Sequence, residues 1–195
     1  NTLKNDSDRL IKRIEVLCRE YNRLSNDEEK WNYFYKKRDS FNKKQIRCVT
    51  RSALFWFLMK AGYNGVYRVN SNGKFNVPCG KRNKIVCNKE KMEEISKKIQ
   101  NVEFSCMDYN VFIDMVLEKE KKKSLFMYCD PPYIPEEKVI NKKQELYTNK
   151  TFEHNEFVDY IKQINTNKLL ISMSESKKAD KIYKDFQKYK VDEII

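Results

Sequence analysis

The sequence predicts an α/β protein, because two kinds of hydrophobic pattern divide it. In the second half, the apolar runs 124–129 and 169–174 show no alternation, which suits strands buried on both faces of a parallel sheet. Helical patterns surround these runs, so that strands and helices alternate. In the first half, helical patterns precede one hairpin signal. We therefore predict a helical and β-hairpin region over 1–100 and an α/β region over 101–195.

Three helices are expected before the hairpin. Residues 8–24 carry apolar side chains at helical spacing, and a second helix runs through Trp31 and Phe34. Residues 47–61 are apolar almost all round and are followed by Gly62, which is typical of a buried helix stopped by a C-cap glycine.

The hairpin and the remaining elements follow in order. The β-prone runs GVYRVN and KFNVP flank an SNG turn within 65–78, which is a strong hairpin signal. The later patterns predict helices over 89–100, 109–118, 153–165 and 176–188 and a strand over 101–107.

Glycine and proline are concentrated at two places. All four glycines lie within 62–80, and three of the four prolines lie within 131–135. Phosphate loops and dinucleotide fingerprints need glycine for positive φ and for close approach of the backbone to an anion. Such loops are therefore excluded outside 62–80.

Composition excludes several further classes of protein. No apolar run is long enough to span a bilayer and no signal-peptide pattern opens the chain, so we expect a soluble, intracellular protein. The six cysteines form no CxxC pair, and the single histidine, His154, lies in a polar stretch. These features predict free buried thiols, a surface histidine and no bound metal.

The formal net charge of +12 favours a polyanion as partner, because lysine and arginine neutralise phosphates and release counterions. A lysine-rich surface that maintains solubility would explain the same charge, so charge alone does not decide between the two.

The most specific feature is the tetrapeptide Asp130-Pro131-Pro132-Tyr133, directly after the run 124–129. Ligands of parallel α/β sheets bind beyond the carboxyl ends of the strands. Two prolines fix φ and lack N–H donors, so the Asp130 carboxylate and the Pro131 carbonyl can both accept hydrogen bonds from one amino group. Tyr133 offers a flat ring for stacking on a base.

This arrangement has a chemical use. An adenine amino group is a poor nucleophile, because its lone pair is delocalised into the ring. Two acceptors favour its pyramidal form and stabilise the positive charge that develops when it attacks a methyl sulfonium. A tight turn after a strand would explain the tetrapeptide alone equally well.

Several spaced segments together resemble the Dam-like (D12 class) N6-adenine DNA methyltransferases. Residues 51–84 resemble the target-recognition segment of that family, and DPPY at 130–133 matches its catalytic motif. CMDY at 106–109 and LLISMSES at 169–176 resemble the segments before and after that motif. The resemblance implies part of a Rossmann-like class I methyltransferase sheet with an inserted target-recognition domain.

The resemblance also implies roles in catalysis. Asp130, Pro131, Pro132 and Tyr133 would form the pocket for an adenine flipped out of duplex DNA. The methyl donor would be S-adenosylmethionine, with its adenosine part near Asp108 and Tyr109 and with Asp130 facing both donor and base.

In the recognition segment, the resemblance implies that the hairpin enters the major groove, where Arg68 contacts a guanine. Tyr63 and Asn64 would enter the base stack or replace the flipped base, and Val66 and Pro78 would touch a thymine methyl. Phosphate contacts are expected from the neighbouring cations, Lys74, Lys81, Arg82 and Lys84. Without the family, a surface arginine and a core aromatic would be the default interpretations of Arg68 and Tyr63.

One departure from the family is large. The family's GGK-type motif and its glycine-containing loop, which hold the donor, are absent, so we expect an internal portion of a longer enzyme. A catalytically incompetent DNA-binding remnant is therefore an alternative. Methylation of RNA or of a protein glutamine is a further alternative, but Asp at the first position of the motif and the hairpin argue against it.

The expected setting follows from this interpretation. We expect a monomer that acts on double-stranded DNA, in a short palindrome such as GATC, and not on a membrane. A bacterial, phage or viral cytoplasm is the expected location, with a restriction endonuclease as a genetic partner.

Overall fold

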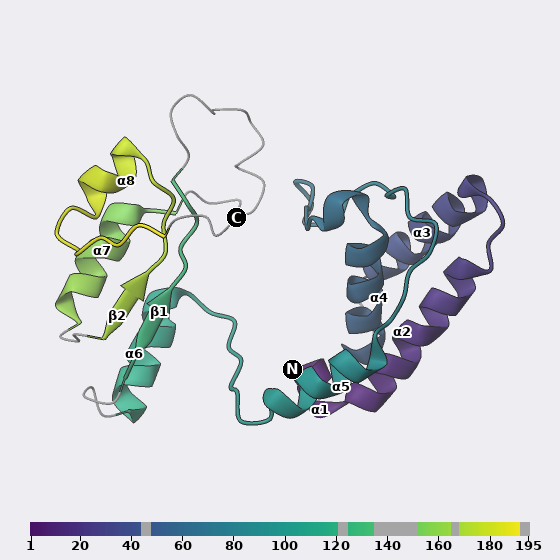
Figure 1. Ribbon diagram of the computed structural model, residues 1–195, viewed down its shortest axis with the longest axis horizontal. Coiled ribbons are helices and arrows are strands. Elements are labelled where there is room, and N and C mark those ends of the chain that lie inside the picture. The colour runs from purple at the N-terminus through teal and green to yellow at the C-terminus, as the bar shows by residue number, and fades with distance from the viewer. Residues whose placement is uncertain (44–47, 121–124, 135–151, 165–167, 192–195) are drawn as a thin grey trace. The chain divides into compact units, whose positions relative to one another are not determined.

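The computed structural model describes residues 1–43, 48–120, 125–134, 152–164 and 168–191. The chain divides into two compact units, Asn1–Phe104 and Ser105–Ile195 (Figure 1), and each unit has its own hydrophobic core. Among the described residues, no helix is both long and apolar enough to cross a membrane.

The first unit is built from helices. Their bounds are α1 Thr2–Asn5, α2 Ser7–Asn22, α3 Asp27–Phe41, α4 Cys48–Ala61 and α5 Lys89–Lys98, with a 3-10 turn, η1, at Tyr63–Gly65. The helices expected over 8–24, around Trp31, over 47–61 and over 89–100 are confirmed, although residue 47 lies outside the described residues.

Local chemistry explains where these helices begin and which face they bury. In α2 the apolar side chains recur every three or four residues, so they form one buried stripe. The Asn26 side chain accepts a hydrogen bond from the Glu29 N–H and caps α3, whose first turn also carries three carboxylates.

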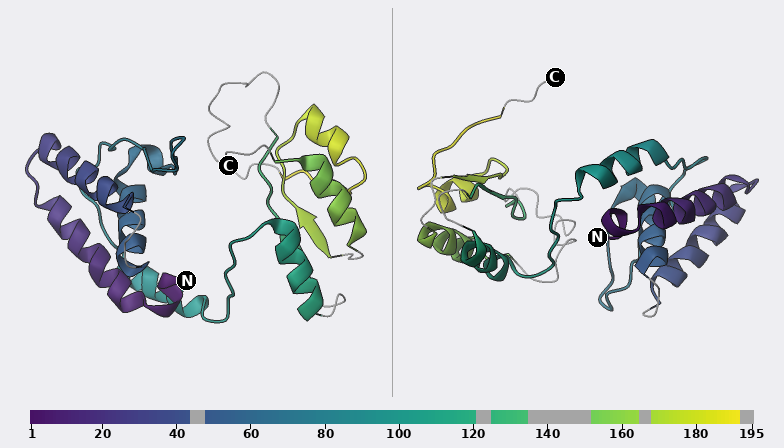
Figure 2. Two further views of the ribbon diagram at one scale, coloured as in Figure 1. Left: turned by 180° about the vertical axis from the view of Figure 1, so that it is seen from behind. Right: turned by 90° about the horizontal axis from the view of Figure 1, so that it is seen from below.

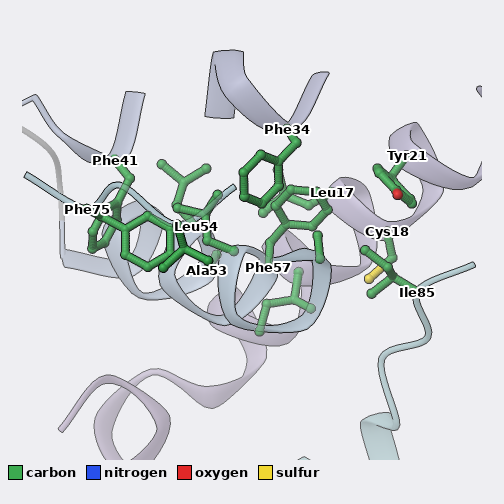
Figure 3. Packing of buried hydrophobic residues seen from close by; sticks show 14 of the residues in the cluster. Leu17, Cys18, Tyr21, Phe34, Phe41, Ala53, Leu54, Phe57, Phe75 and Ile85 are labelled. Carbon is green, nitrogen blue, oxygen red and sulfur yellow. The ribbon is translucent and has the colours of Figure 1, made fainter. Parts of the chain in front are cut away.

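The core of the first unit centres on Phe57 of α4. Figure 3 shows its ring between α2 and α3, and its side chain is 0% exposed. Tyr21 and Tyr33 meet this ring edge-on, with centroid distances of 5.7 and 5.6 Å. Such edge-to-face aromatic contacts stabilise a core beyond the area that they bury. The three long helices therefore form one packed body (Figures 1 and 2).

The segment after α4 runs out and back as an antiparallel hairpin, but with isolated bridges in place of continuous strands. The bridges join Gly62 to Cys79 and Val69 to Phe75. Asn70 makes the tip: its backbone N–H donates to the Lys74 carbonyl at 2.9 Å, and Gly73 adopts a φ of +69°.

Side chains of α3 hold the returning arm of the hairpin. Asn42, at the end of α3, accepts from the Phe75 N–H at 2.9 Å and donates to the Phe75 carbonyl at 3.0 Å. Arg38 donates to the Val77 carbonyl at 3.3 Å. The ladder bonds to the first arm are made by Lys74 and Asn76, so the backbone groups of Phe75 and Val77 point away from that arm. The returning arm is therefore held by α3 along its outer edge.

The described part of the second unit contains helices and one pair of parallel strands. Strand β1 (Met127–Cys129) pairs in parallel with β2 (Leu169–Ile171), with Cys129 opposite Ile171. Its helices are α6 Tyr109–Lys119, α7 His154–Gln163 and α8 Lys177–Ile182, of which α8 is shorter than predicted. Residues 124 and 165, at the ends of two expected elements, lie outside the described residues.

Two expectations about strands are wrong. Residues 101–107 form no strand, because every side chain over 101–108 is exposed and the segment joins the two units. The strands β1 and β2 are not buried on both faces: Tyr128 is 57% and Leu170 49% exposed. Side chains alternate across a strand, and the described helices of this unit pack against the face that carries Met127 and Cys129.

Phe57→Ala is expected to lower the free energy of unfolding of the first unit by about 3 to 5 kcal/mol, because it leaves a cavity at the centre of the core. Phe55→Ala is the matched control, since Phe55 lies on the same helix with 43% of its side chain exposed. Urea denaturation followed by circular dichroism measures both losses. Equal losses would contradict the described core.

Candidate active site and DNA-binding surface

Two polar residues follow the two parallel strands directly. Asp130 comes after β1 and Ser172 after β2, and the Ser172 N–H donates to the Cys129 carbonyl at 3.0 Å, which continues the ladder by one step. The Ser172 hydroxyl donates to Oδ1 of Asp130 at 2.6 Å, and the Tyr128 hydroxyl donates to Ser172 Oγ at 3.1 Å. The carboxyl ends of the strands therefore carry a connected polar group.

The rest of the tetrapeptide has one buried residue and two exposed ones. Pro131 is buried, and Ile134, which follows the tetrapeptide, belongs to the core of the second unit. The Ile134 carbonyl accepts from the Ser174 hydroxyl at 3.4 Å. Pro132 is exposed and Tyr133 is 53% exposed. A rigid segment thus presents a carboxylate and an aromatic ring to solvent.

Asp108 and Tyr109 lie at the start of α6. Asp108 is the exposed N-cap residue of this helix. The Tyr109 ring packs edge-on against Phe157, with a centroid distance of 5.2 Å, and also meets Phe152 and Tyr160. Burial, followed by the nearby Glu156 and Asp108 carboxylates, raises the pKa of the Tyr109 hydroxyl. Tyr109 therefore contributes to packing, while the Asp108 carboxylate remains accessible.

In the first unit, Arg68 is fixed by the opposite arm of the hairpin. Its Nε donates to Oδ1 of Asn76 at 2.9 Å and its Nη2 to the Asn76 carbonyl at 3.3 Å. A guanidinium has five N–H donors, so Nη1 and the second hydrogen of Nη2 still form a pair suited to two acceptors. Arg68 is half-buried and held in one orientation.

The turn η1 presents other expected contact residues. Tyr63, Asn64 and Val66 are all exposed, and the Tyr63 N–H donates to the carbonyl of the exposed Pro78 at 3.0 Å. Asn64 has a φ of +52°, in the left-handed region where asparagine is tolerated better than most residues. The structure thus brings Tyr63 and Pro78 together through the backbone.

Four expected phosphate contacts, Lys74, Lys81, Arg82 and Lys84, are exposed in the first unit. A surface cavity of about 400 Å³ is lined by Asn64, Arg82 and Lys84 together with Lys60, at the end of α4. Sequence reasoning missed Lys60. Its position in the last turn of α4, four residues before Asn64, was the signal that could have identified it.

Hydrogen bonds from α2 hold the chain beside this cavity. The Tyr21 hydroxyl donates to the Arg82 carbonyl at 2.7 Å, and the Asn22 side chain bonds both the N–H and the carbonyl of Ile85, at 2.9 and 2.8 Å. Arg82 and Lys84 therefore lie on a segment whose backbone is fixed by α2.

His154 was expected at the surface and is half-buried instead. Its Nδ1 lies 2.9 Å from the Tyr183 hydroxyl, and its ring meets Phe152 edge-on. Burial, and next the positive charge of Lys178, lower the pKa of His154 below the usual 6.5, although Glu153 opposes the shift. The surroundings of His154 therefore favour the neutral imidazole.

The comparison with known families decides the relationship of this chain. A family model described as D12 class N6 adenine-specific DNA methyltransferase matches residues 1–195. The chain belongs to this family. The resemblance expected from DPPY and the recognition segment is thus confirmed.

Three similar proteins are informative about this D12-class chain. It is 35% identical over 201 residues to the type II methyltransferase M.MjaIII of Methanocaldococcus jannaschii, covering 97% of this chain and 66% of that protein. It is 32% identical over 152 residues to M1.LlaDCHI of Lactococcus lactis, covering 74% and 51%. It is 36% identical over 102 residues to the DNA adenine methylase of Escherichia coli, covering 52% and 34%. The chain therefore matches less than two thirds of the length of each relative.

Acidification is expected to destabilise the second unit through His154. Its pKa is lower in the folded protein than in the unfolded chain, so the unfolded chain binds a proton first as the pH falls below about 6.5. Stability is therefore lost below that pH. Thermal denaturation between pH 8 and pH 5 should show a larger loss for the natural protein than for His154→Gln. A difference between the two proteins that does not change with pH would contradict this.

Proposed function

We propose that the protein transfers a methyl group from S-adenosylmethionine to the N6 amino group of an adenine in double-stranded DNA. The observation that carries the proposal is the placement of Asp130 and Pro131 at the carboxyl end of β1, where the Asp130 carboxylate is exposed and held by Ser172. We assign catalysis to the second unit and target recognition to the helical and hairpin region before it.

The residues of the tetrapeptide suit an amino-group substrate. Asp130 and the Pro131 carbonyl accept the two N6 hydrogens, which favours the pyramidal nitrogen and stabilises its developing positive charge. Because the amino group cannot meet a methyl donor inside the duplex, the adenine is flipped out of the stack. Its ring then stacks on the exposed Tyr133, beside the stiff backbone that Pro132 provides.

The methyl donor is accommodated in part by this chain. Asp108 and Asp130 are exposed carboxylates, which fit the hydroxyl groups of a nucleoside as hydrogen-bond acceptors, and Tyr109 fixes the backbone beside Asp108. When bound, S-adenosylmethionine supplies an electrophilic methyl group on a positively charged sulfur. Residues 105–195 contain no glycine, so they lack the family's glycine-containing loop. No metal enters the proposal.

The first unit reads the DNA in this proposal. Arg68 donates its free N–H pair to O6 and N7 of a guanine in the major groove. Tyr63 and Asn64 contact the stack at the place of the flipped base, while Val66 and Pro78 touch a thymine methyl. Phosphates are contacted by the exposed cations of this unit, Lys74, Lys81, Arg82 and Lys84, and the net charge of +12 supports this partner.

We infer the biological setting from the names of similar proteins. Two of the similar proteins are named type II methyltransferases, which supports a restriction–modification role in the cytoplasm with a restriction endonuclease as genetic partner. We infer a monomer acting on a short palindrome, of which GATC is one form.

Asp130→Ala is expected to lower the methylation rate at least about 100-fold, because it removes one of two groups aimed at the developing charge. Affinity for duplex DNA should stay unchanged, since phosphate contacts dominate it. Methyl incorporation and filter binding, on protein made from its complete reading frame, measure the two effects. Asp159→Ala, an exposed carboxylate on α7, is the control.

Two results of that assay would count against the proposal. Undiminished methylation by Asp130→Ala would exclude Asp130 from catalysis. A natural protein that binds DNA but neither methylates it nor binds S-adenosylmethionine in a calorimetric titration would be a DNA-binding remnant.

Arg68→Ala is expected to relax sequence choice at one base position, at a cost of about 1 to 3 kcal/mol for the preferred base. Lys74→Ala, at the hairpin tip, should instead weaken binding equally for all sequences and reduce the salt dependence. Competition binding with a set of singly substituted duplexes separates the two patterns. A uniform loss for Arg68→Ala would make it a phosphate contact.

A further inference from the structure

A chain of two hydrogen bonds ends on the Asp130 carboxylate. The Ser172 hydroxyl lies 2.6 Å from Asp130 Oδ1, and the Tyr128 hydroxyl lies 3.1 Å from Ser172 Oγ. A carboxylate only accepts hydrogen bonds, so the Ser172 hydroxyl must donate to it. The single hydrogen of Ser172 is then used, and the Tyr128 hydroxyl donates to Ser172. The direction of both bonds is thus fixed by the chemistry of the groups.

The backbone fixes where these groups meet. Ser172 follows β2 and is tied to β1 by the bond from its N–H to the Cys129 carbonyl, at 3.0 Å. Tyr128 points to the exposed face of the strand pair, away from the core against which Met127 and Cys129 pack. The Tyr128 hydroxyl can therefore bond to Ser172 on that face, and Tyr128 does not pack into the core.

We propose that Ser172 is a positioning residue for Asp130 and that Tyr128 acts through Ser172. This inference rests on the proposed methyl transfer. The serine hydroxyl holds the carboxylate in one rotamer and uses one lone pair of Oδ1. The other lone pairs remain for the adenine amino group, which must meet Asp130 and the Pro131 carbonyl at the same time.

The expected effect is on the rate and not on binding. A hydrogen bond to a carboxylate is among the stronger ones in proteins, and a displacement of about 1 Å in a reacting group can lower a rate about 100-fold. Ser172→Ala should therefore lower kcat between about 10- and 100-fold. The KM for DNA should stay the same, because the phosphate contacts lie in the other unit.

The test is a set of four variants: Ser172→Ala, Ser172→Thr, Tyr128→Phe and the double variant Tyr128→Phe/Ser172→Ala. Ser172→Thr keeps the hydroxyl and should retain most of kcat. Tyr128→Phe alone should lower kcat by a smaller factor than Ser172→Ala. In the double variant, Tyr128→Phe should have no further effect, because the bond through which it acts is gone. Ser40→Ala, whose hydroxyl bonds only within α3 to the Lys36 carbonyl at 2.9 Å, is the control.

The outcomes separate this inference from the proposed function. If the natural protein is active and Asp130→Ala is not, while Ser172→Ala retains full kcat, the inference is overturned and the proposed function stands. A loss for Ser172→Ala that Ser172→Thr does not restore, accompanied by a lower melting temperature, would show a structural role and also overturn it. Independent effects of Tyr128→Phe and Ser172→Ala would overturn the role of Tyr128. A natural protein without methylation activity would overturn both proposals.

Discussion

The parallel pairing of β1 with β2 is the interaction on which the candidate active site depends. With Cys129 opposite Ile171, the next residues along the two strands are Asp130 and Ser172, and a hydrogen bond joins their side chains. Side chains alternate across a strand, so a shift of one residue would bring Ile171 or Met173 to the position of Ser172. The apolar residues that β1 and β2 bury against α6 and α7 exclude this shift, because it would also expose them. The hydrophobic pattern of the second unit thus determines the polar geometry at its strand ends.

A different arrangement supports the residues that we assign to DNA recognition. These residues lie in segments without regular secondary structure. Side chains of the helices, such as Asn42 and Tyr21, hold these segments by hydrogen bonds to their backbone. Within the hairpin, Asn76 holds the Arg68 side chain. The aromatic core around Phe57 makes this body rigid. Contact residues can therefore be exposed and still be held in defined positions, as recognition of base edges requires.

The sequence predicted the helices of both units and the strand before Asp130, because hydrophobic periodicity and helix-stop signals are local. The sequence did not predict the role of Ser172, because that role depends on the pairing of two strands that are about 40 residues apart. Only the register of β1 and β2 brings Ser172 to Cys129. The hairpin was predicted, but the attachment of its returning arm to α3 was not, because Asn42 reaches the outward-facing backbone of Phe75 from a helix that is distant in sequence. His154 was assigned to the surface from its polar neighbours, yet the chain folds Tyr183 against it.

The proposed role of Asp130 and Pro131 can be tested by a crystal structure of the protein bound to a donor analogue and to a duplex that contains its target adenine. We expect the adenine to lie outside the stack, with its N6 within about 3 Å of both Asp130 and the Pro131 carbonyl, as hydrogen bonds require. Ser172 should remain bonded to Asp130. An adenine that stays paired in the duplex, or whose N6 contacts neither acceptor, would show that Asp130 and Pro131 do not hold the substrate amino group.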